Sequence, residues 1–336
     1  MPDGSFDSKL PQMIFLETTT ACNLRCSLCP RFVDDYARQG SLMPIEVYDS
    51  VRPYFSDLRE LALVGCGEPL TDKRLLHFVA EAAGHNVYVM FTTNGTLLNA
   101  DLNLHIIQSG LGLLGISIDG ASRQVFEQIR DGAQFETVVE NARDFIQMRN
   151  CLGIRPIVKI QVVILKQNLM DLPALVHLAA ELGADELYAK NPSIFCENGH
   201  SPDSLQETVG SSEDVHQCNE AIAAALQMAR ACGLRAVFPS YQQQGPSDCP
   251  YHPQRQLYIR RDGEVFPCPM YAVTHSVAKC MGNVLNNTLA DIWCSPAFQE
   301  FRAKFITGRE GTCVTCSLWR QGYQVYSPRP IFSYCY

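Results

Sequence analysis

The chain has 336 residues, of which 46% are hydrophobic and 18% charged, a balance typical of a globular protein with a sizeable core. Its formal net charge is −8 and it contains no run of Lys or Arg, which argues against nucleic acid or an anionic membrane surface as a partner. The N-terminal residues 1–10 lack the basic and apolar regions of a signal peptide, and no apolar run reaches the roughly 18 residues of a transmembrane helix. We therefore expect a cytoplasmic protein.

The content of 15 cysteines departs from that ordinary composition. In a secreted chain it would indicate disulfides, but no export signal is present and two groups of cysteines have the spacing of metal ligands. A reducing compartment and iron–sulfur chemistry account better for this content.

Short apolar strands alternate with amphipathic helices from about residue 12 to residue 237. Apolar residues at 172, 175, 176, 179 and 182, for example, recur at helical spacing. Strands separated by helices indicate a parallel sheet, and six such units predict an α/β fold, a partial (β/α)6 TIM-like barrel, over residues 1–240. In such barrels the site lies at the C-terminal ends of the strands. The expected strands are Met13–Glu17, Leu61–Val64, Val87–Phe91, Leu113–Ile118, Ile157–Leu165 and Glu186–Ala189.

Alternation within the strands predicts which side chains face the barrel lumen. In 157–165 the apolar residues at even positions should pack on helices, which turns Lys159 and Gln161 inward. The same counting places five further polar side chains on the lumen side. The pattern alone does not distinguish a functional role from an ordinary hydrogen-bonded one. These five residues are Glu17, Ser117, Asp119, Tyr188 and Lys190.

A small α+β region is expected from residue 241 to residue 336. Residues 240–253 are rich in Gln, Pro, Ser and Gly and indicate a linker. A hairpin should follow, with strands Leu257–Arg260 and Glu264–Phe266 joined by a turn at Asp262-Gly263. Two short helices are expected around Leu289–Trp293 and Ala297–Phe305.

The first cysteine group is Cys22, Cys26 and Cys29, in a loop that follows the first strand. Three thiolates at this spacing can bind three irons of a [4Fe–4S] cluster and leave the fourth iron open to a small molecule. A structural zinc site would normally be closed by a fourth ligand, and the three cysteines alone do not exclude it.

Four motifs, each at a strand end, extend this pattern: Cys22–Pro30, Gly65–Pro69, Thr92–Gly95 and Ser117–Gly120. Together they resemble the radical S-adenosylmethionine (SAM) superfamily, over roughly residues 12 to 240. The stretch from Phe126 to Asn141 is also similar to family sequence. Two departures are Leu28, where the family usually has an aromatic residue, and Cys66, which replaces a glycine.

The resemblance implies that SAM binds the open iron and that the reduced cluster cleaves it to a 5′-deoxyadenosyl radical, which takes a hydrogen atom from the substrate. It also implies an external one-electron donor such as flavodoxin or ferredoxin. In the motif Gly65-Cys66-Gly67-Glu68-Pro69, the Glu68 carboxylate would accept from the SAM ammonium. Ser117 would contact the ribose or carboxylate and Arg130 the carboxylate, although a strand-end turn and a surface charge explain these two equally well. The other residues assigned to SAM binding are Thr93, Asn94, Asp119 and Gln161.

The second cysteine group consists of Cys249, Cys268, Cys313 and Cys316. It resembles the Twitch domain, the shorter version of the SPASM auxiliary-cluster domain, and this implies one auxiliary [4Fe–4S] cluster. Zinc at the four thiolates is the alternative. Cys280 or Cys335 could replace one of the four ligands.

The shorter auxiliary domain resembles that of aminocyclitol and sugar dehydrogenases, which implies a small-molecule substrate and oxidation of a carbinol carbon to a ketone. The candidates for the base are Lys159, Tyr188 and Lys190. One alternative is a radical epimerase that uses Cys196, in the loop 191–212, as hydrogen donor. Another is maturation of a ribosomal peptide. A non-catalytic electron carrier would not require the motifs at 65–69 and 92–95.

Overall fold

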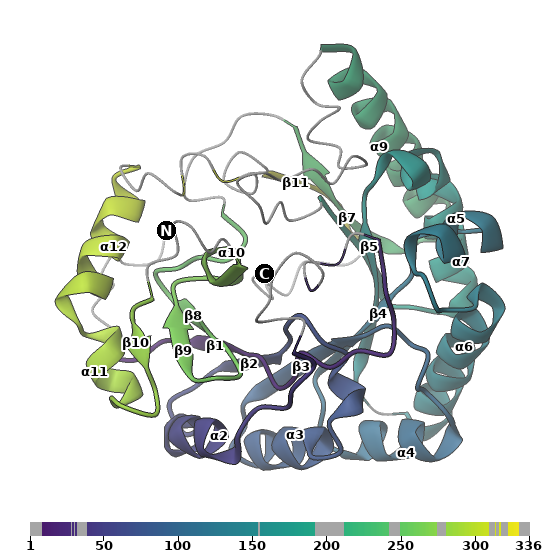
Figure 1. Cartoon of the computed structure of the whole chain (residues 1–336). Helices are drawn as coiled ribbons and strands as arrows, with labels where there is room; N and C mark the ends of the chain where they lie inside the picture. The colour runs from purple at the N-terminus through teal and green to yellow at the C-terminus, as the bar shows by residue number, and fades with distance from the viewer. Residues whose placement is uncertain are drawn as a thin grey trace.

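The computed structural model describes residues 9–27, 29, 31, 39–153, 155–191, 212–241, 249–273, 280–308, 313, 316 and 322–328. Within these residues all strands belong to one 11-stranded sheet, in the order β10-β9-β8-β1-β2-β3-β4-β5-β6-β7-β11. The sheet curves around a central space, and the helices that connect the parallel strands lie outside it (Figure 1). This arrangement confirms the predicted partial barrel.

Neighbouring strands from β1 to β7 pair in parallel. Their bounds are β1 Met13–Leu16, β2 Glu60–Leu63, β3 Tyr88–Thr93, β4 Leu113–Ser117, β5 Ile157–Val163, β6 Glu186–Lys190 and β7 Arg235–Ser240. The helices between them are α2 Ile45–Val51, α3 Leu75–Gly84, α4 Ala100–Gln108, α5 Arg123–Ile129, α6 Phe135–Leu152, α7 Leu172–Leu182 and α9 Ser212–Cys232, with 3-10 turns η2 Arg52–Tyr54, η3 Pro69–Thr71 and η4 Lys166–Asp171.

The core between barrel and helices follows the predicted periodicities. On β5 the side chains of Val158, Ile160 and Val162 are at most 1% exposed, as expected for the face that packs on helices. On α7 the residues at 172, 175, 176, 179 and 182 are all buried. The first six strands were predictable because the spacing of apolar residues in the sequence matches the positions that are buried in the structure.

The sequence analysis did not predict β7, which pairs in parallel with β6. Its segment Arg235–Ser240 is short, contains a proline, and lies where the strand–helix alternation ends. Only the long-range pairing with β6 distinguishes it from the start of a linker.

The C-terminal region continues the barrel sheet at both of its ends. Strand β8 (Gln256–Ile259) pairs in parallel with β1, and β11 (Gly322–Tyr326) pairs antiparallel with β7. The predicted hairpin is confirmed, because β9 (Glu264–Phe266) pairs antiparallel with β8. Short elements follow this hairpin, and they include the two predicted helices. Their bounds are α10 Pro269–Val273, β10 Gly282–Asn283, α11 Leu289–Trp293 and α12 Pro296–Ile306.

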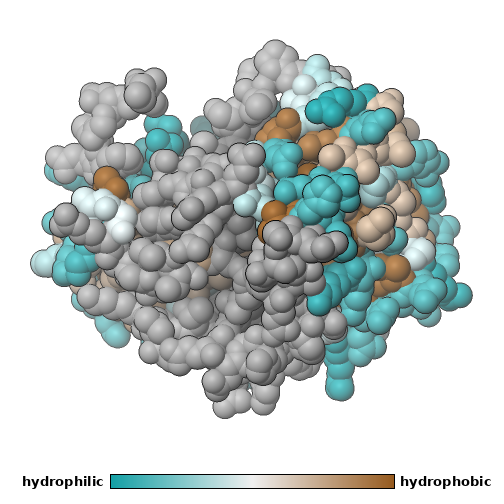
Figure 2. All heavy atoms as spheres, turned by 90° about the horizontal axis from the view of Figure 1, so that it is seen from above, coloured by the Kyte–Doolittle hydropathy of each residue, from teal (hydrophilic) through white to brown (hydrophobic). Residues whose placement is uncertain are grey.

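The proposed domain boundary at residue 240 falls at the end of β7 and remains a prediction. Strands on both sides of it share the sheet, so the C-terminal region is built onto the barrel. The visible described surface is mostly hydrophilic, with separate hydrophobic groups (Figure 2). None of the described helices combines the length and the hydropathy needed to span a membrane.

Candidate functional site

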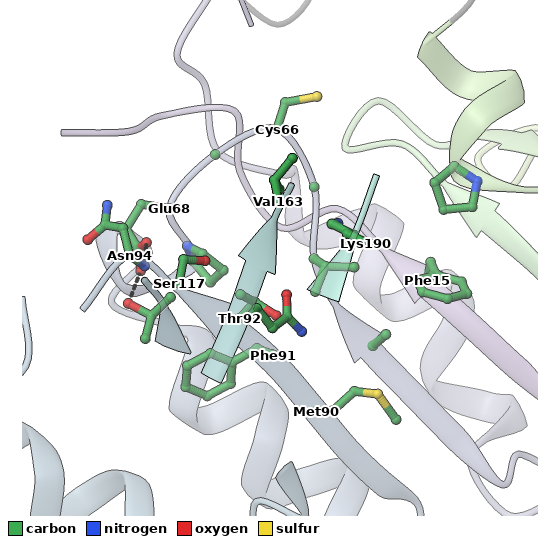
Figure 3. Close-up of a pocket in the computed structure, with 18 of the residues that line it drawn as sticks. Phe15, Cys66, Glu68, Met90, Phe91, Thr92, Asn94, Ser117, Val163 and Lys190 are labelled. Atoms are coloured by element: carbon green, nitrogen blue, oxygen red, sulfur yellow. Dashed lines mark hydrogen bonds between the residues drawn. The ribbon is translucent and has the colours of Figure 1, made fainter. Parts of the chain in front are cut away.

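A cavity of about 360 Å³ opens where the parallel strands end (Figure 3). One part of its wall comes from the loops after β1, β2 and β3, and another from the C-terminal region. Its size falls in the range of small-molecule sites. Cys22, Cys26 and Cys29 all line it.

Backbone hydrogen bonds on both sides of Cys26 join the cysteine loop to the segment at the end of α5. The N–H of Arg25 donates to the carbonyl of Asp131 at 2.9 Å, and the N–H of Ser27 to the carbonyl of Ile129 at 3.1 Å. Burial raises the pKa of the Cys26 thiol to about 11, although Arg130 lowers it in part. A thiolate here therefore needs positive charge beside it, which a bound iron–sulfur cluster provides.

The donor set fits such a cluster. The three thiols share one cavity, and none of its described lining residues is a histidine. Among the described residues no group of three or more His, Cys, Asp and Glu side chains is arranged to hold a single metal ion. Sulfur ligands spread around one wall suit a cubane, which presents its irons at separate corners.

The loop after β2 packs so closely on the loop after β1 that glycine is required at two positions. A Cβ atom at Gly65 would lie 2.3 Å from Cγ of Glu17, and one at Gly67 would lie 2.4 Å from the carbonyl oxygen of Thr19. The N–H of Cys66, between them, donates to Oε1 of Glu17 at 2.9 Å. The two glycines thus place the backbone of residues 65–67 against the cavity.

The Glu68 carboxylate is 3% exposed and accepts three hydrogen bonds. Oε1 accepts from the Thr93 hydroxyl at 2.7 Å and from the N–H of Leu70 at 3.2 Å, and Oε2 accepts from the N–H of Asn94 at 2.7 Å (Figure 3). Burial raises the pKa of Glu68, and these bonds oppose the rise in part. The carboxylate therefore joins the β2 loop to the end of β3. Its contact with the SAM ammonium remains a prediction.

Asn94 connects this network to the cysteine loop. Its side-chain amide donates to Oδ1 of Asn23 at 2.9 Å and lies 4.0 Å from Sγ of Cys22. Asn23 in turn donates to the Thr96 hydroxyl at 2.7 Å. Asn23 was not among the site residues predicted from the sequence. Its only signal was its position directly after Cys22.

Asp119 and Arg130 form a buried ion pair beside the same loop. Oδ2 of Asp119 accepts from Nε of Arg130 at 2.6 Å, and Oδ1 accepts from the N–H of Val163 at 2.7 Å. Burial lowers the pKa of Arg130, but Asp119, Cys26 and Cys29 together outweigh it and the net shift is upward. Arg130 lines the cavity, which argues against the alternative that it is an ordinary surface charge.

The predicted lumen residues separate into two groups. Ser117, Gln161, Tyr188 and Lys190 line the cavity, and burial lowers the pKa of Lys190. Lys159 is not among the lining residues. It is 1% exposed, and its Nζ lies 3.0 Å from Oε1 of Glu186.

Glu186 also pairs with Arg235, so Lys159 belongs to a buried ion group at the starts of β6 and β7. This position makes Lys159 the least suitable of the three base candidates. Cys196 lies outside the described residues, as does most of its loop.

The auxiliary cysteines lie next to the cavity. Burial and, to a smaller extent, the charge of Cys316 raise the pKa of Cys249 to about 11. Burial also raises the pKa of Cys268, and the charges of Cys249 and Cys316 add to that rise, which indicates that the three thiols are close together. The N–H of Cys316 donates to the carbonyl of Cys313 at 3.1 Å. The set of thiols fits an iron–sulfur cluster, and these four described side chains are not arranged to hold a single metal ion such as zinc.

The residues that follow Cys249 and Cys268 form part of the cavity wall. They are Pro250, Tyr251, Pro269 and Met270. Of the alternative ligands, Cys280 is exposed and its thiol contacts the carbonyl of Gly282 at 3.2 Å, while Cys335 lies outside the described residues.

Comparison with known families agrees with both sites. Residues 16–179 match the radical SAM superfamily, and residues 249–317 match SPASM, an iron–sulfur cluster-binding domain. The chain therefore contains a radical SAM domain followed by a C-terminal SPASM domain. The first domain implies a [4Fe–4S] cluster and SAM, and the second implies auxiliary iron–sulfur clusters.

Among curated proteins, the chain is 26% identical to the tungsten-containing aldehyde ferredoxin oxidoreductase cofactor-modifying protein of Pyrococcus furiosus, over 91% of this chain and 87% of that one. It is 25% identical to the PqqA peptide cyclase of Rhodopseudomonas palustris, over 92% and 80%. The mycofactocin maturase MftC of Mycolicibacterium smegmatis is 28% identical over 52% of this chain and 43% of that one.

Two solved structures share the fold. Streptococcus suis SuiB bound to precursor peptide SuiA superposes with a TM-score of 0.67 at 16% identity, over 93% of this chain and 70% of that one. Native anSMEcpe with bound AdoMet superposes with a TM-score of 0.65 at 18% identity, over 92% and 88%.

Proposed function

We propose that this radical SAM enzyme modifies a peptide by oxidation at a side chain that enters the cavity. The observation that carries the proposal is the similarity to PqqA peptide cyclases, which includes the SPASM domain and extends over 92% of the chain. Similarity to a mycofactocin maturase, over 52% of the chain, points the same way.

Oxidation of a sugar or aminocyclitol was the first expectation from the sequence, and the relatives reported above give it no support. Peptide maturation was an alternative there, and it agrees better with these relatives. The proposed substrate is accordingly a peptide and not a small molecule. The need for an external one-electron donor is common to both.

When bound, the cluster and SAM would supply the radical that removes a hydrogen atom from the substrate, and the auxiliary cluster would accept the second electron of the oxidation. The chain's own residues position the reactants. Glu68 and Asn94 line the cavity and would hold SAM. Aromatic side chains also line it, which suits an apolar or aromatic side chain of a peptide. They are Phe15, Phe91, Tyr188, Tyr251, Tyr258 and Tyr323.

Lys190 is the favoured base for the proton that an oxidation releases. Its side chain lines the cavity at the end of β6, and its lowered pKa increases the neutral fraction that can accept a proton. Tyr188 is less suited, because its hydroxyl already bonds to the Tyr323 hydroxyl at 2.9 Å.

A second candidate function is modification of the cofactor of another protein. It is favoured by the similarity to the cofactor-modifying protein of Pyrococcus furiosus, which covers 87% of that protein. The two proposals differ in whether the substrate is a short peptide or a folded protein's cofactor.

The test is co-expression with each short open reading frame that neighbours the gene, followed by anaerobic reaction of the reconstituted enzyme with SAM, reductant and purified peptide. We expect peptide-dependent 5′-deoxyadenosine and a peptide lighter by two hydrogens. The variant in which Cys22, Cys26 and Cys29 are all Ala is the negative control. If no peptide stimulates SAM cleavage while a cyclitol or sugar does, the peptide proposal is wrong.

Repeating the reaction in D2O separates oxidation from hydrogen return by a thiol. Oxidation removes two hydrogens and adds no deuterium. A gain of one deuterium that is lost in Cys196→Ala would establish the epimerase alternative instead.

A further inference from the structure

Cys26 and Arg130 lie opposite one another on two segments that are joined by backbone hydrogen bonds on either side of them. The bonds from Arg25 and Ser27 reach the carbonyls of residues 131 and 129, so the residues between them, 26 and 130, are held opposite one another. Both side chains line the cavity. The hydroxyl of Ser27 also contacts the carbonyl of Ile129 at 3.4 Å. Arg130 is therefore fixed beside the cysteine loop by the backbone as well as by its charge.

The guanidinium is fixed from the other side by Asp119. This carboxylate is 0% exposed, bonds to Nε of Arg130 at 2.6 Å, and is itself held by the N–H of Val163 on β5. Asn168 donates to the carbonyl of Asp119 at 2.7 Å and so holds its backbone as well. The pair thus has little freedom to move away from the loop.

The positive member of the pair lies nearer to the thiols. Arg130 lines the cavity, whereas Asp119 is not among the lining residues. A charge at the position of the cysteine sulfurs therefore experiences a net positive field from the pair.

We propose that Arg130, positioned by Asp119, raises the reduction potential of the cluster bound by Cys22, Cys26 and Cys29 before SAM binds. Reduction transfers one electron from an external donor, such as reduced flavodoxin, to the cluster, and the donor is oxidised by one electron. The cluster gains a negative charge, which a fixed cation in a water-poor site stabilises. The inference rests on the radical SAM site of the proposed function and is independent of the substrate.

The test is a potentiometric titration of the SAM-free cluster, followed by electron paramagnetic resonance, on the full-length reconstituted enzyme. Addition of SAM identifies the signal of this cluster, because only the open iron changes its ligands. The variants are Arg130→Gln, Asp119→Asn and the double variant. Arg25→Gln is the matched control, since it removes the same charge one residue from Cys26 on an exposed side chain.

In Arg130→Gln we expect the ratio of reduced to oxidised cluster, at a fixed applied potential, to fall about tenfold, which is ~59 mV for one electron. Asp119→Asn should shift the ratio in the opposite direction, because it removes the compensating anion. The double variant should lie between the two single variants, and Arg25→Gln should stay within about twofold of wild type, because solvent screens an exposed charge.

Opposite signs in the two single variants distinguish a field effect from loss of structure, which would shift both the same way or release iron. If Arg130→Gln loses iron, the reduction potential of the SAM-free cluster is compared between wild type, Arg130→Lys and the double variant. Neither of these two variants leaves Asp119 as an unpaired buried charge. The proposal is overturned if Arg130→Gln keeps its iron and the SAM-free potential is unchanged. It is also overturned if only SAM affinity changes, which would make Arg130 a SAM ligand. Failure of the radical SAM assignment is a separate result, in which wild-type enzyme shows no SAM-dependent signal and no SAM cleavage.

Discussion

Replacing Glu68 by Ala removes the acceptor for three hydrogen bonds at once. Two of the donors are the Thr93 hydroxyl and the Asn94 N–H. Both residues are at most 5% exposed, so these donors would lose their partner inside the protein. Hydrogen bonds to a charged group contribute about 1.5–3 kcal/mol each. Because burial raises the pKa of Glu68, part of that gain is already offset by the cost of burying the carboxylate. We therefore expect the free energy of unfolding without SAM to fall by about 3 kcal/mol.

SAM binding should weaken in the same variant by about 1.5–3 kcal/mol if the carboxylate accepts from the SAM ammonium. The pH dependence gives a second readout. The ordinary pKa of 4.5 is raised by burial, so SAM affinity should increase as the pH rises through the folded pKa and the carboxylate ionises. The stability of the SAM-free protein should change oppositely. Glu68 contributes stability that is present below pH 4.5 and lost as the pH rises through the raised pKa.

Urea unfolding of the SAM-free protein and equilibrium SAM binding, each measured across this pH range, check both expectations. Glu68→Gln should flatten both pH profiles, because it has no titrating group. Thr93→Val is the control: it removes one of the three bonds to Glu68 and also the acceptor of the Gly95 N–H, should cost about 1–3 kcal/mol, and should leave the pH dependence in place. The reasoning is refuted if Glu68→Ala unfolds at the wild-type urea concentration and binds SAM with wild-type affinity.

Three further predictions use independent measurements. Reconstituted enzyme should contain about eight irons per chain, and the variant with Cys22, Cys26 and Cys29 all replaced by Ala should retain about four; a wild-type count of four that disappears in this variant would argue against the auxiliary cluster. Gly67→Ala should lower stability by about 1–3 kcal/mol and weaken SAM binding, because its Cβ would lie 2.4 Å and 2.6 Å from two backbone carbonyl oxygens, and unfolding in urea checks it. If Lys190 is the base, turnover should rise with pH through its lowered pKa, and Lys190→Arg should fail to restore the rate lost in Lys190→Met; a full rescue by Arg would show that only the charge matters.

The sequence determined those features that depend on local spacing. Alternation of apolar residues identified six parallel strands, because burial on one face imposes a period of two wherever the strand lies. The spacing of Cys22, Cys26 and Cys29 and the motifs at strand ends indicated the cluster and SAM. The match of residues 16–179 to the radical SAM superfamily agrees with this prediction.

The tertiary structure decided the features that depend on which distant segments meet. Strand β11 pairs with β7 and β8 with β1, so the C-terminal region extends the barrel sheet, and no local pattern specifies that register. Lys159 illustrates the same limit. Alternation placed it on the same face of β5 as Gln161, which lines the cavity, but Lys159 does not line it and instead forms a buried ion pair with Glu186 on another strand.

Arg130 shows the converse case. In the sequence it is one charged residue after a short helix, and a surface position explained it equally well. Two backbone bonds to the cysteine loop and a buried Asp119 place it beside the thiols, which only the folded chain can bring about. Electrostatic roles of this kind follow from distances between segments about a hundred residues apart, because a charge acts through space and not along the chain.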